Sequence, residues 1–370
     1  MAKLFEPLPL RSLLLPNRIV IPPMCQYSAR QGSANDWHLI HLGSLALSGA
    51  GLLIIEATGV SPEGRITEGC LGLWSDENEE ALARVLDSVR RYSDMPLGIQ
   101  LSHAGRKASV VSPLVGSGPL SPEAGGWRTV GPSPLAFGAG WSTPTQLDAA
   151  GMARIAADFA AAARRADRLG LDLIELHCAH GYLLSQFLSP LANKRTDSYG
   201  GSPENRMRFP LEVYEAVRAE WPAHKPLGVR LNGTDWAPDG VTPQDAVDFA
   251  RALHLRGCDY VDVSSGGNAY VKIRTGPGYQ VPFAEAIRQE VGIATMAVGL
   301  IQTAAFAEEI VATGRADMVA IGRGMLNNPH WPWRAAEELQ VALKVPSQYA
   351  RAATSKGLPP PSWTPVSASA

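Results

Sequence analysis

The stretch LGVRLNGTDWAPDGVTPQDAVDFARALHLRGCDYVDVS, residues 227–264, contains the unit from which the fold is built. An apolar run at 227–231 precedes a helical pattern at 242–256, and a second apolar run follows at 260–264. Thr242 suits a helix N-cap and Pro243 the first helical position, while Gly257 ends the helix. Short runs that are apolar throughout and separated by a helix are typical of parallel strands buried on both faces.

The same unit recurs along the chain. Further apolar runs occur at 18–24, 51–57, 97–101, 172–177, 293–298 and 318–322, and further helical patterns at 77–92, 148–169 and 302–313. Eight strand-then-helix units predict a single-domain (β/α)8 TIM barrel with loop insertions. An open doubly wound sheet is the second choice, since the first strand lacks the GxGxxG turn of that fold.

The length exceeds what a barrel requires. A barrel takes about 250 residues, and this chain has 370. We expect the excess in loop insertions, of which 102–146 is the clearest because it is rich in Gly, Pro and Ser. The barrel is predicted over 1–349. Residues 350–370 are predicted to be an extended or partly mobile extension, since 358–370 is rich in Pro and Ser.

Composition excludes several classes of protein. Lys+Arg 33 against Asp+Glu 35 gives a net charge of −2, which argues against a nucleic-acid binder. The four cysteines are scattered without a CxxC pair, which argues against a disulfide scaffold or a cysteine-rich zinc site. No apolar run reaches the roughly 18 residues of a membrane helix, and the N-terminus lacks a signal-peptide core. We expect a cytoplasmic protein without membrane or nucleic-acid partners.

Polar residues gather where the predicted strands end, which is where barrels carry their active sites. They are PPMCQY at 22–27, QLSHAGRK at 100–107, HCAHGY at 177–182, Arg230, SSGG at 264–267, Gly299, and Gly322 with Arg323. Glycines after strands seven and eight, with an arginine beside them, suit a phosphate site. The alternative interpretation is that they are plain turns.

His177 and His180 allow three interpretations. They are a donor pair for one carbonyl oxygen, part of a zinc site, or hydrogen-bonded structural histidines. Zinc lacks an evident third ligand, because Cys178 points the other way on an extended backbone. Tyr182 is either a proton donor or a packing residue. Cys25 is either an inert thiol or one that faces a cofactor, since no His–Asn pair adjoins it.

Taken together, the motifs resemble the Old Yellow Enzyme family. They are PPMCQY at 22–27, EAT at 56–58, QLSHAGRK at 100–107, HCAHGYLLSQFLSP at 177–190, NKRTDSYGGSPENR at 193–206, GPGYQ at 276–280 and IGR at 321–323. The resemblance spans about residues 4–349. The cysteine at 25 and the pair of histidines at 177 and 180 resemble the residues that the bacterial branch often called thermophilic-like has in these motifs.

The resemblance implies an FMN-dependent ene-reductase that passes a hydride from NADPH or NADH through the flavin to the β-carbon of an activated alkene, in one site with ping-pong kinetics. The implied flavin-binding residues are Pro22, Pro23, Met24, Cys25, Ala57, Gln100, His177, Arg230, Gly299, Gly322 and Arg323. His177 and His180 would hold the substrate carbonyl, with Tyr27 and Tyr182 beside it. Tyr182 would donate the proton, Cys25 would tune the flavin, and no metal is expected.

Further expectations follow from the same resemblance. The chain would form a homo-oligomer, a dimer or tetramer, in which Arg351 reaches a neighbouring site. Arg195, Asp197, Asn205 and Arg206 are predicted to be a structural polar network rather than a second site. Val298 is small and would leave a wide substrate pocket. Two other functions stay open: a flavin-binding sensor or store without turnover, and a colourless phosphate-binding aldolase, for which no Schiff-base lysine is visible at a strand end.

Overall fold

A computed structural model describes residues 2–351. Eight parallel strands close into a barrel in the order β10-β11-β12-β3-β4-β5-β8-β9. Their bounds are β3 (Ile19–Ile21), β4 (Leu52–Gly59), β5 (Leu97–Ser102), β8 (Leu173–Cys178), β9 (Leu227–Asn232), β10 (Tyr260–Ser264), β11 (Ala294–Ala297) and β12 (Met318–Ala320). The predicted (β/α)8 barrel is confirmed, with each strand within three residues of its apolar run.

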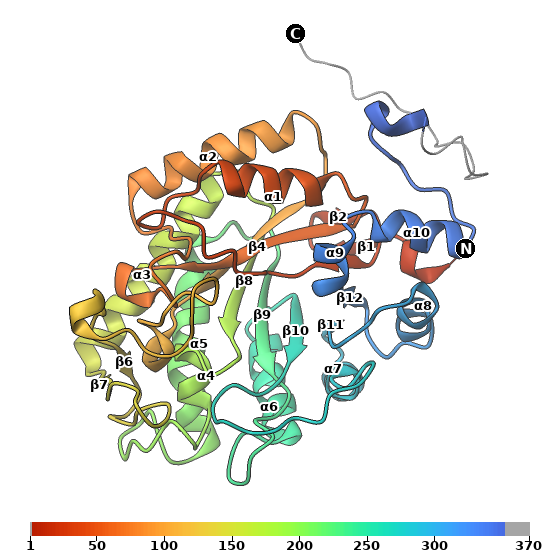
Figure 1. Ribbon diagram of the computed structural model, residues 1–370. Helices are drawn as coiled ribbons and strands as arrows, with labels where there is room; N and C mark the ends of the chain where they lie inside the picture. The colour runs from red at the N-terminus through yellow and green to blue at the C-terminus, as the bar shows by residue number, and fades with distance from the viewer. Residues whose placement is uncertain (1, 352–370) are drawn as a thin grey trace.

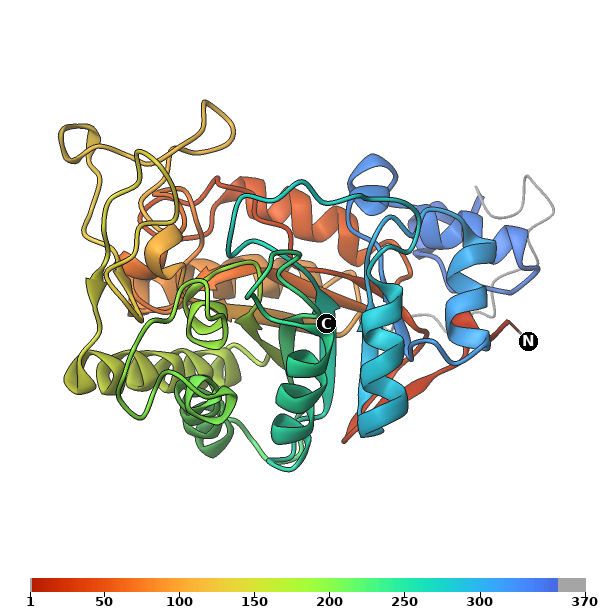
Figure 2. The same cartoon turned by 90° about the horizontal axis from the view of Figure 1, so that it is seen from below.

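Helices surround the barrel, as Figures 1 and 2 show. They are α1 (Asp36–Ala46), α2 (Asp76–Arg90), α3 (Ala149–Arg168), α4 (Leu183–Leu188), α5 (Pro203–Glu220), α6 (Pro243–His254), α7 (Val281–Val291), α8 (Ala304–Ala312), α9 (Arg323–Asn327) and α10 (Trp331–Glu338). The predicted N-terminus of α6 is confirmed: the Thr242 side chain accepts from the Asp245 N–H, the Asp245 side chain accepts from the Thr242 N–H in a capping box, and Pro243 is the first helical residue. The helix ends at His254 with Leu255 as its C-cap, slightly before the predicted Gly257.

Two apolar cores stabilise the barrel. The larger lies between the strands and the surrounding helices. The smaller fills the interior and consists of Leu10, Leu15, Val20, Leu52, Ile54, Leu173, Tyr260, Met296, Met318 and Ala320. Because the strands are buried on both faces, their sequences are apolar throughout rather than alternating.

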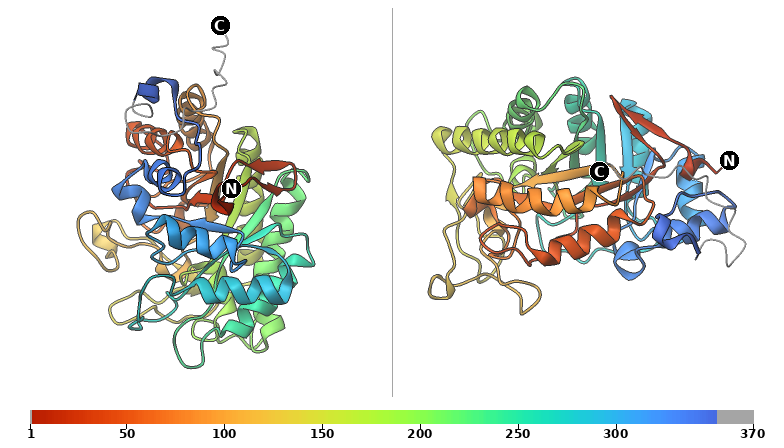
Figure 3. Two further views of the ribbon diagram at one scale, coloured as in Figure 1. Left: turned by 90° about the vertical axis from the view of Figure 1, so that its right-hand side faces the viewer. Right: turned by 90° about the horizontal axis from the view of Figure 1, so that it is seen from above.

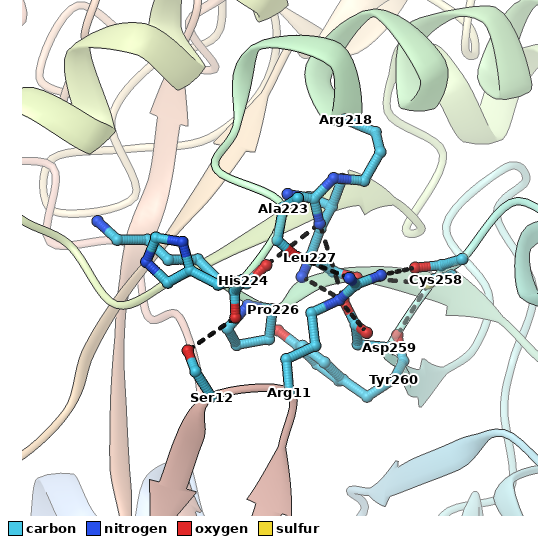
Figure 4. A network of polar contacts seen from close by, with 12 residues as sticks. Arg11, Ser12, Arg218, Ala223, His224, Pro226, Leu227, Cys258, Asp259 and Tyr260 are labelled. Atoms are coloured by element: carbon cyan, nitrogen blue, oxygen red, sulfur yellow. Dashed lines mark hydrogen bonds and ion pairs between the residues drawn. The ribbon is translucent and has the colours of Figure 1, made fainter.

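A hairpin of β1 (Leu8–Leu10) and β2 (Leu13–Leu15) covers the end of the barrel at which the strands begin. Its turn residue Arg11 donates to Asp259 Oδ1 at 2.5 Å and to the carbonyl oxygens of Ala223 and Gly257 (Figure 4). Ser12 donates to the His224 carbonyl oxygen at 2.8 Å. The hairpin thus closes this end of the barrel and leaves the opposite end, where the strands finish, for a ligand.

The predicted insertion after β5 is confirmed as a long loop region that projects from the body (Figure 3). Its regular elements are short: η3 (Gly105–Lys107), η4 (Pro122–Ala124), β6 (Val130–Gly131) and β7 (Thr145–Gln146). Three further 3-10 turns are η1 (Lys3–Phe5), η2 (Pro62–Gly64) and η5 (Ser347–Tyr349). Most of the predicted extension, including 358–370, lies outside the described residues. Within residues 2–351, no helix combines the length and apolar character needed to cross a bilayer.

Candidate active site

A polar layer crosses the barrel interior below the strand ends. Register pairs Ala57 on β4 with Gln100 on β5, and Gln100 with Glu175 on β8. The Gln100 amide donates to Glu175 Oε1 at 2.8 Å, and the Tyr260 hydroxyl donates to Glu175 Oε2 at 3.2 Å. Burial, with the nearby Asp262 carboxyl, raises the pKa of Glu175 to about 8. The layer fixes the orientation of the Gln100 amide.

The next layer toward the open end contains a cation. His177, Arg230 and Asp262 stand side by side on β8, β9 and β10. Arg230 is 8% exposed, and its Nε lies 3.0 Å from Asp262 Oδ2. Within the described part of the chain, this ion pair is the only polar contact of the Arg230 side chain, and Nε itself makes no hydrogen bond of good geometry. A buried guanidinium whose N–H groups lack protein acceptors suits a ligand that offers hydrogen-bond acceptors.

The side chains of His177 and His180 contact each other on the open-end side of Arg230. His177 Nδ1 accepts from the Ala179 N–H at 3.2 Å, and His177 Nε2 lies 3.4 Å from His180 Nδ1. Burial first, and then the Arg230 charge, hold the pKa of both imidazoles well below the usual range. Both rings are therefore neutral, and each carries one N–H for donation.

His180 adopts a strained backbone that its surroundings enforce. Its φ of 58° lies in the left-handed region, which costs a residue with a side chain about 1–3 kcal/mol. Lys107 Nζ donates to the His180 carbonyl at 2.6 Å and to that of Gly267 at 3.0 Å. Asn232 Oδ1 accepts from the His180 N–H at 3.0 Å. A Cβ at Gly267 would overlap the His180 backbone, so glycine is required there.

Tyr182, Tyr27 and Cys25 pack against one small apolar cluster formed by Ile66, Cys70, Ala104 and Ala108. The Tyr182 ring meets the His177 ring edge-on, with centroids 4.9 Å apart. Burial first, and then Cys25 and Tyr27, raise the pKa of the Tyr182 hydroxyl well above its usual range. Tyr182 is thus a protonated phenol beside the histidine pair, a suitable source of a proton.

Cys25 is a half-buried thiol. Burial raises the pKa of its thiol well above the usual range, so the reactive thiolate is suppressed. The loop that holds it is anchored by Glu56, whose Oε2 accepts from the Gln26 N–H at 3.0 Å. Glu56 occupies a register irregularity between Ile55 and Ala57 of β4, so the bulge both anchors the 22–27 loop and precedes Ala57.

The glycines after the last two barrel strands line a cradle. Gly299 adopts a φ of 132°, and its carbonyl oxygen accepts from the Gly278 N–H at 2.7 Å. A Cβ at Gly322 would meet only Met24 Sδ and Pro22 Cγ, both at 3.6 Å. Arg323 follows Gly322, is exposed, lies near Tyr279, and makes no hydrogen bond or ion pair within the described residues. The structure therefore places these residues, with the adjoining Pro23, around the same end of the barrel.

The donor set fits an FMN. The cradle has glycine backbone and the exposed Arg323, which suit a phosphate, while Arg230 and Gln100 present donors from the interior. Among residues 2–351, no three His, Cys, Asp or Glu side chains gather as a metal site would require. Arg351 is exposed and follows η5.

The 193–206 block is confirmed as structural. Arg195 donates to the carbonyl oxygens of Pro132 and Leu147 at 3.0 and 2.7 Å, and its Nε donates to Asp197 Oδ1 at 2.9 Å. Arg206 and Asn205 donate to backbone carbonyl oxygens nearby. Their hydrogen bonds shape the segment after α4.

Sequence reasoning assigned no individual role to four site residues: Lys107 and Ser264, which lie in motifs it singled out, and Glu175 and Asp262, which it did not consider. The sequence contained a feature that could have pointed to Glu175 and Asp262, because each is a carboxylate inside an otherwise apolar strand. Lys107 lies in a motif already singled out, but only the fold brings its ammonium to the His180 carbonyl. Ser264 ends β10 and lies 2.6 Å from His180 Nε2, a contact between residues 84 apart in the chain.

Comparison with known proteins agrees with this geometry. A family model described as the NADH:flavin oxidoreductase / NADH oxidase family matches residues 3–342. The chain is 45% identical over 350 residues to an NADPH dehydrogenase of Geobacillus thermodenitrificans (strain NG80-2), covering 94% of this chain and 98% of that one. It is 41% identical over 351 residues to an NADPH dehydrogenase of Bacillus subtilis (strain 168), with the same coverage.

A solved structure of morphinone reductase in complex with tetrahydroNAD superimposes with a TM-score of 0.76. The sequences are 31% identical, and the match covers 93% of this chain and 92% of that one. The likeness thus extends over the whole barrel.

Proposed function

The chain belongs to the NADH:flavin oxidoreductase / NADH oxidase family, the Old Yellow Enzyme group, and is an FMN-dependent oxidoreductase; from that premise we propose that it uses NADPH to reduce the carbon–carbon double bond of α,β-unsaturated carbonyl compounds. The observation that carries the proposal is the neutral histidine pair, buried at His177 and half-buried at His180, with nitrogens 3.4 Å apart, next to a protonated Tyr182.

Residues around the strand ends would bind the flavin. Gly299, Gly322 and Arg323 would hold the phosphate, and Ala57, Gln100 and Arg230 would contact the ring. Pro22, Pro23, Met24, Cys25 and His177 would line it. Bound FMN supplies hydride-transfer chemistry between the nicotinamide and the alkene. The chain's own groups bind, orient and polarise the substrate.

The histidines hold and polarise the substrate. A carbonyl oxygen placed between His177 Nε2 and His180 Nδ1 can accept from both rings. When the β-carbon of the alkene gains a hydride, negative charge develops on that oxygen, and each donor is worth about 2.7–4 kcal/mol in sites of this kind. Tyr27 and Tyr182 border the substrate, and the Tyr182 hydroxyl delivers the proton that the α-carbon requires. Solvent then restores the Tyr182 proton.

The substrate class and assembly also belong to the proposal. The partners are small activated alkenes, and NADPH and the alkene occupy one site in turn, which requires ping-pong kinetics. The chain forms a homo-oligomer, with Arg351 reaching a neighbouring site.

The test separates the two half-reactions. The purified protein should be yellow, anaerobic NADPH should bleach it, and 2-cyclohexenone should restore the colour. His177→Ala should slow recolouring by the enone at least about 100-fold, from the loss of one such donor, with a much smaller effect on bleaching. A colourless protein would support an aldolase, and a yellow protein that NADPH does not bleach would support a flavin store. Equal losses in both half-reactions would refute the role of His177.

A further inference from the structure

Ser264 connects the histidine pair to a second hydrogen-bonded group. It ends β10, is 5% exposed, and places its Oγ 2.6 Å from His180 Nε2 and 3.4 Å from Gln280 Oε1. A hydroxyl both donates and accepts, and its hydrogen rotates to suit its neighbours. Either His180 Nε2–H donates to Ser264, or the Ser264 hydroxyl donates to a bare Nε2.

The positions of the other hydrogens are determined by their neighbours. His177 Nδ1 accepts the Ala179 N–H, so the single hydrogen of this neutral ring lies on Nε2, facing His180. Ser265 donates to Gln280 Oε1 at 2.6 Å, and Gln280 Nε2 donates to the Val298 carbonyl at 3.3 Å. The Gln280 oxygen is therefore turned toward the serines and already accepts one short bond.

Without a bound carbonyl, the hydrogens form a relay in one direction. His177 Nε2–H donates to His180 Nδ1 at 3.4 Å, His180 Nε2–H donates to Ser264 Oγ, and the Ser264 hydroxyl faces Gln280. In this arrangement His180 presents no N–H toward His177. A carbonyl oxygen placed between the two rings would find one donor instead of two.

We propose that Ser264 is a positioning residue that sets the tautomer of His180: when a substrate carbonyl binds between the two rings, the Ser264 hydroxyl turns to donate to His180 Nε2, and the hydrogen of that ring moves to Nδ1. This inference rests on the proposed function. The N–H bond at Nε2 breaks and one at Nδ1 forms, with the proton exchanged through water. The ring keeps one hydrogen, and the Ser264 O–H bond only rotates.

The geometry favours this switch. Turning the Ser264 hydroxyl gives up only the 3.4 Å contact to Gln280 Oε1, whose short bond from Ser265 remains. The 2.6 Å contact to His180 survives with its direction reversed. The tautomer matters because both rings are neutral: the low pKa of His180, caused by burial, leaves it one hydrogen to place.

The test uses a matched pair of variants with nearly equal shape. Ser264→Thr keeps the hydroxyl, whereas Ser264→Val replaces it with a methyl group. Ser265→Ala is the control, because it removes the other serine on Gln280 and leaves His180 Nε2 its partner. Ser264→Ala provides a smaller variant should valine disturb folding, and FMN content with thermal melting checks each protein.

Two measurements are made on the FMN-loaded, oxidised enzyme without NADPH. The first is the dissociation constant of 2-cyclohexenone, from the change in the flavin visible spectrum. The second is the ¹⁵N NMR spectrum of labelled histidines, which distinguishes Nδ1–H from Nε2–H tautomers. We expect wild-type His180 to carry its hydrogen on Nε2 when free and on Nδ1 when the enone is bound. Because the Ser264 contact is present in both the free and the bound state, its loss should show in the tautomer more than in the dissociation constant. The Thr variant and the Ser265→Ala control should keep the change of tautomer seen in wild type, whereas the Val and Ala variants, which offer no hydroxyl hydrogen to His180 Nε2, should not show it.

The outcomes separate the inference from the proposed function. If wild-type His180 keeps its Nε2 hydrogen with the enone bound, or if the Val variant shows the same change of tautomer as the Thr variant, the role of Ser264 is overturned while the ene-reductase proposal stands. If the wild-type protein binds no enone at all, the proposed function fails and the inference fails with it.

Discussion

Replacing Tyr182 by phenylalanine tests the source of the proton. The ring should stay in place, because its edge-on contact with His177 and the Lys107 ammonium 5.1 Å from its centroid do not involve the hydroxyl. FMN binding and reduction by NADPH should therefore persist. Only the step that protonates the α-carbon loses a group, and a positioned general acid is worth roughly 10²–10⁴-fold.

The size of the effect depends on the alkene. Burial raises the pKa of Tyr182, so the phenol keeps its proton and the wild-type enone half-reaction should be independent of Tyr182 ionisation from pH 6 to 9. For 2-cyclohexenone we expect the variant to lose at least about 100-fold, the lower end of that range. A maleimide is more strongly activated and should lose far less. Reoxidation by oxygen should stay near normal, because it needs no tyrosine proton.

The assay is anaerobic stopped-flow. The enzyme is reduced with one equivalent of NADPH, mixed with the alkene, and followed by the return of flavin absorbance, with wild type and the oxygen reaction as controls. If Tyr182→Phe reacts with cyclohexenone as fast as wild type at every pH from 6 to 9, the assignment is refuted, and Tyr27 or solvent becomes the better candidate.

Three further variants test other parts of the site. Arg323→Ala should weaken FMN binding roughly 10- to 100-fold, from the loss of a charge-assisted hydrogen bond to phosphate; FMN content after gel filtration measures it, and retention equal to that of the exposed-site control Arg91→Ala would contradict the phosphate role. Cys25→Ala should keep FMN and turnover, because the neutral thiol takes no direct part in the reaction. It should shift the flavin reduction potential, because the thiol would line the flavin. Complete loss of activity with FMN bound would mean that Cys25 reacts directly. Burial lowers the pKa of His103 to about 4, so between pH 6.5 and 4 the unfolded chain binds more protons and stability falls with falling pH, by up to about 1.4 kcal/mol per unit. His103→Asn, which offers an oxygen to the Gly105 N–H that His103 Nδ1 now accepts, should flatten that dependence in urea unfolding, and an unchanged slope would show that other groups cause it.

Much of the fold follows from local pattern. Each barrel strand is a short apolar run, because both faces are buried, and helices such as α6 carry cap signals within a few residues. Other helices had cap residues, Asn35 before α1 and Ser202 before α5, but weaker internal signals, since α5 contains Pro210 in its interior. The β1–β2 hairpin is too short to distinguish from a loop, and it becomes recognisable only where Leu10 and Leu15 enter the barrel interior.

For the candidate site, too, some features follow from the sequence and others only from the tertiary structure. The sequence by itself determined which strand ends carry His177, Arg230, Gly299 and Arg323, because parallel strands bring their carboxyl ends to one side of the barrel. Only the tertiary structure decided how the hydrogens of the histidine pair are arranged, since the partner of His180 is Ser264, two strands away. Hydrogen-bond direction depends on distances of a few tenths of an ångström between side chains from different strands, and no local pattern in one strand encodes them.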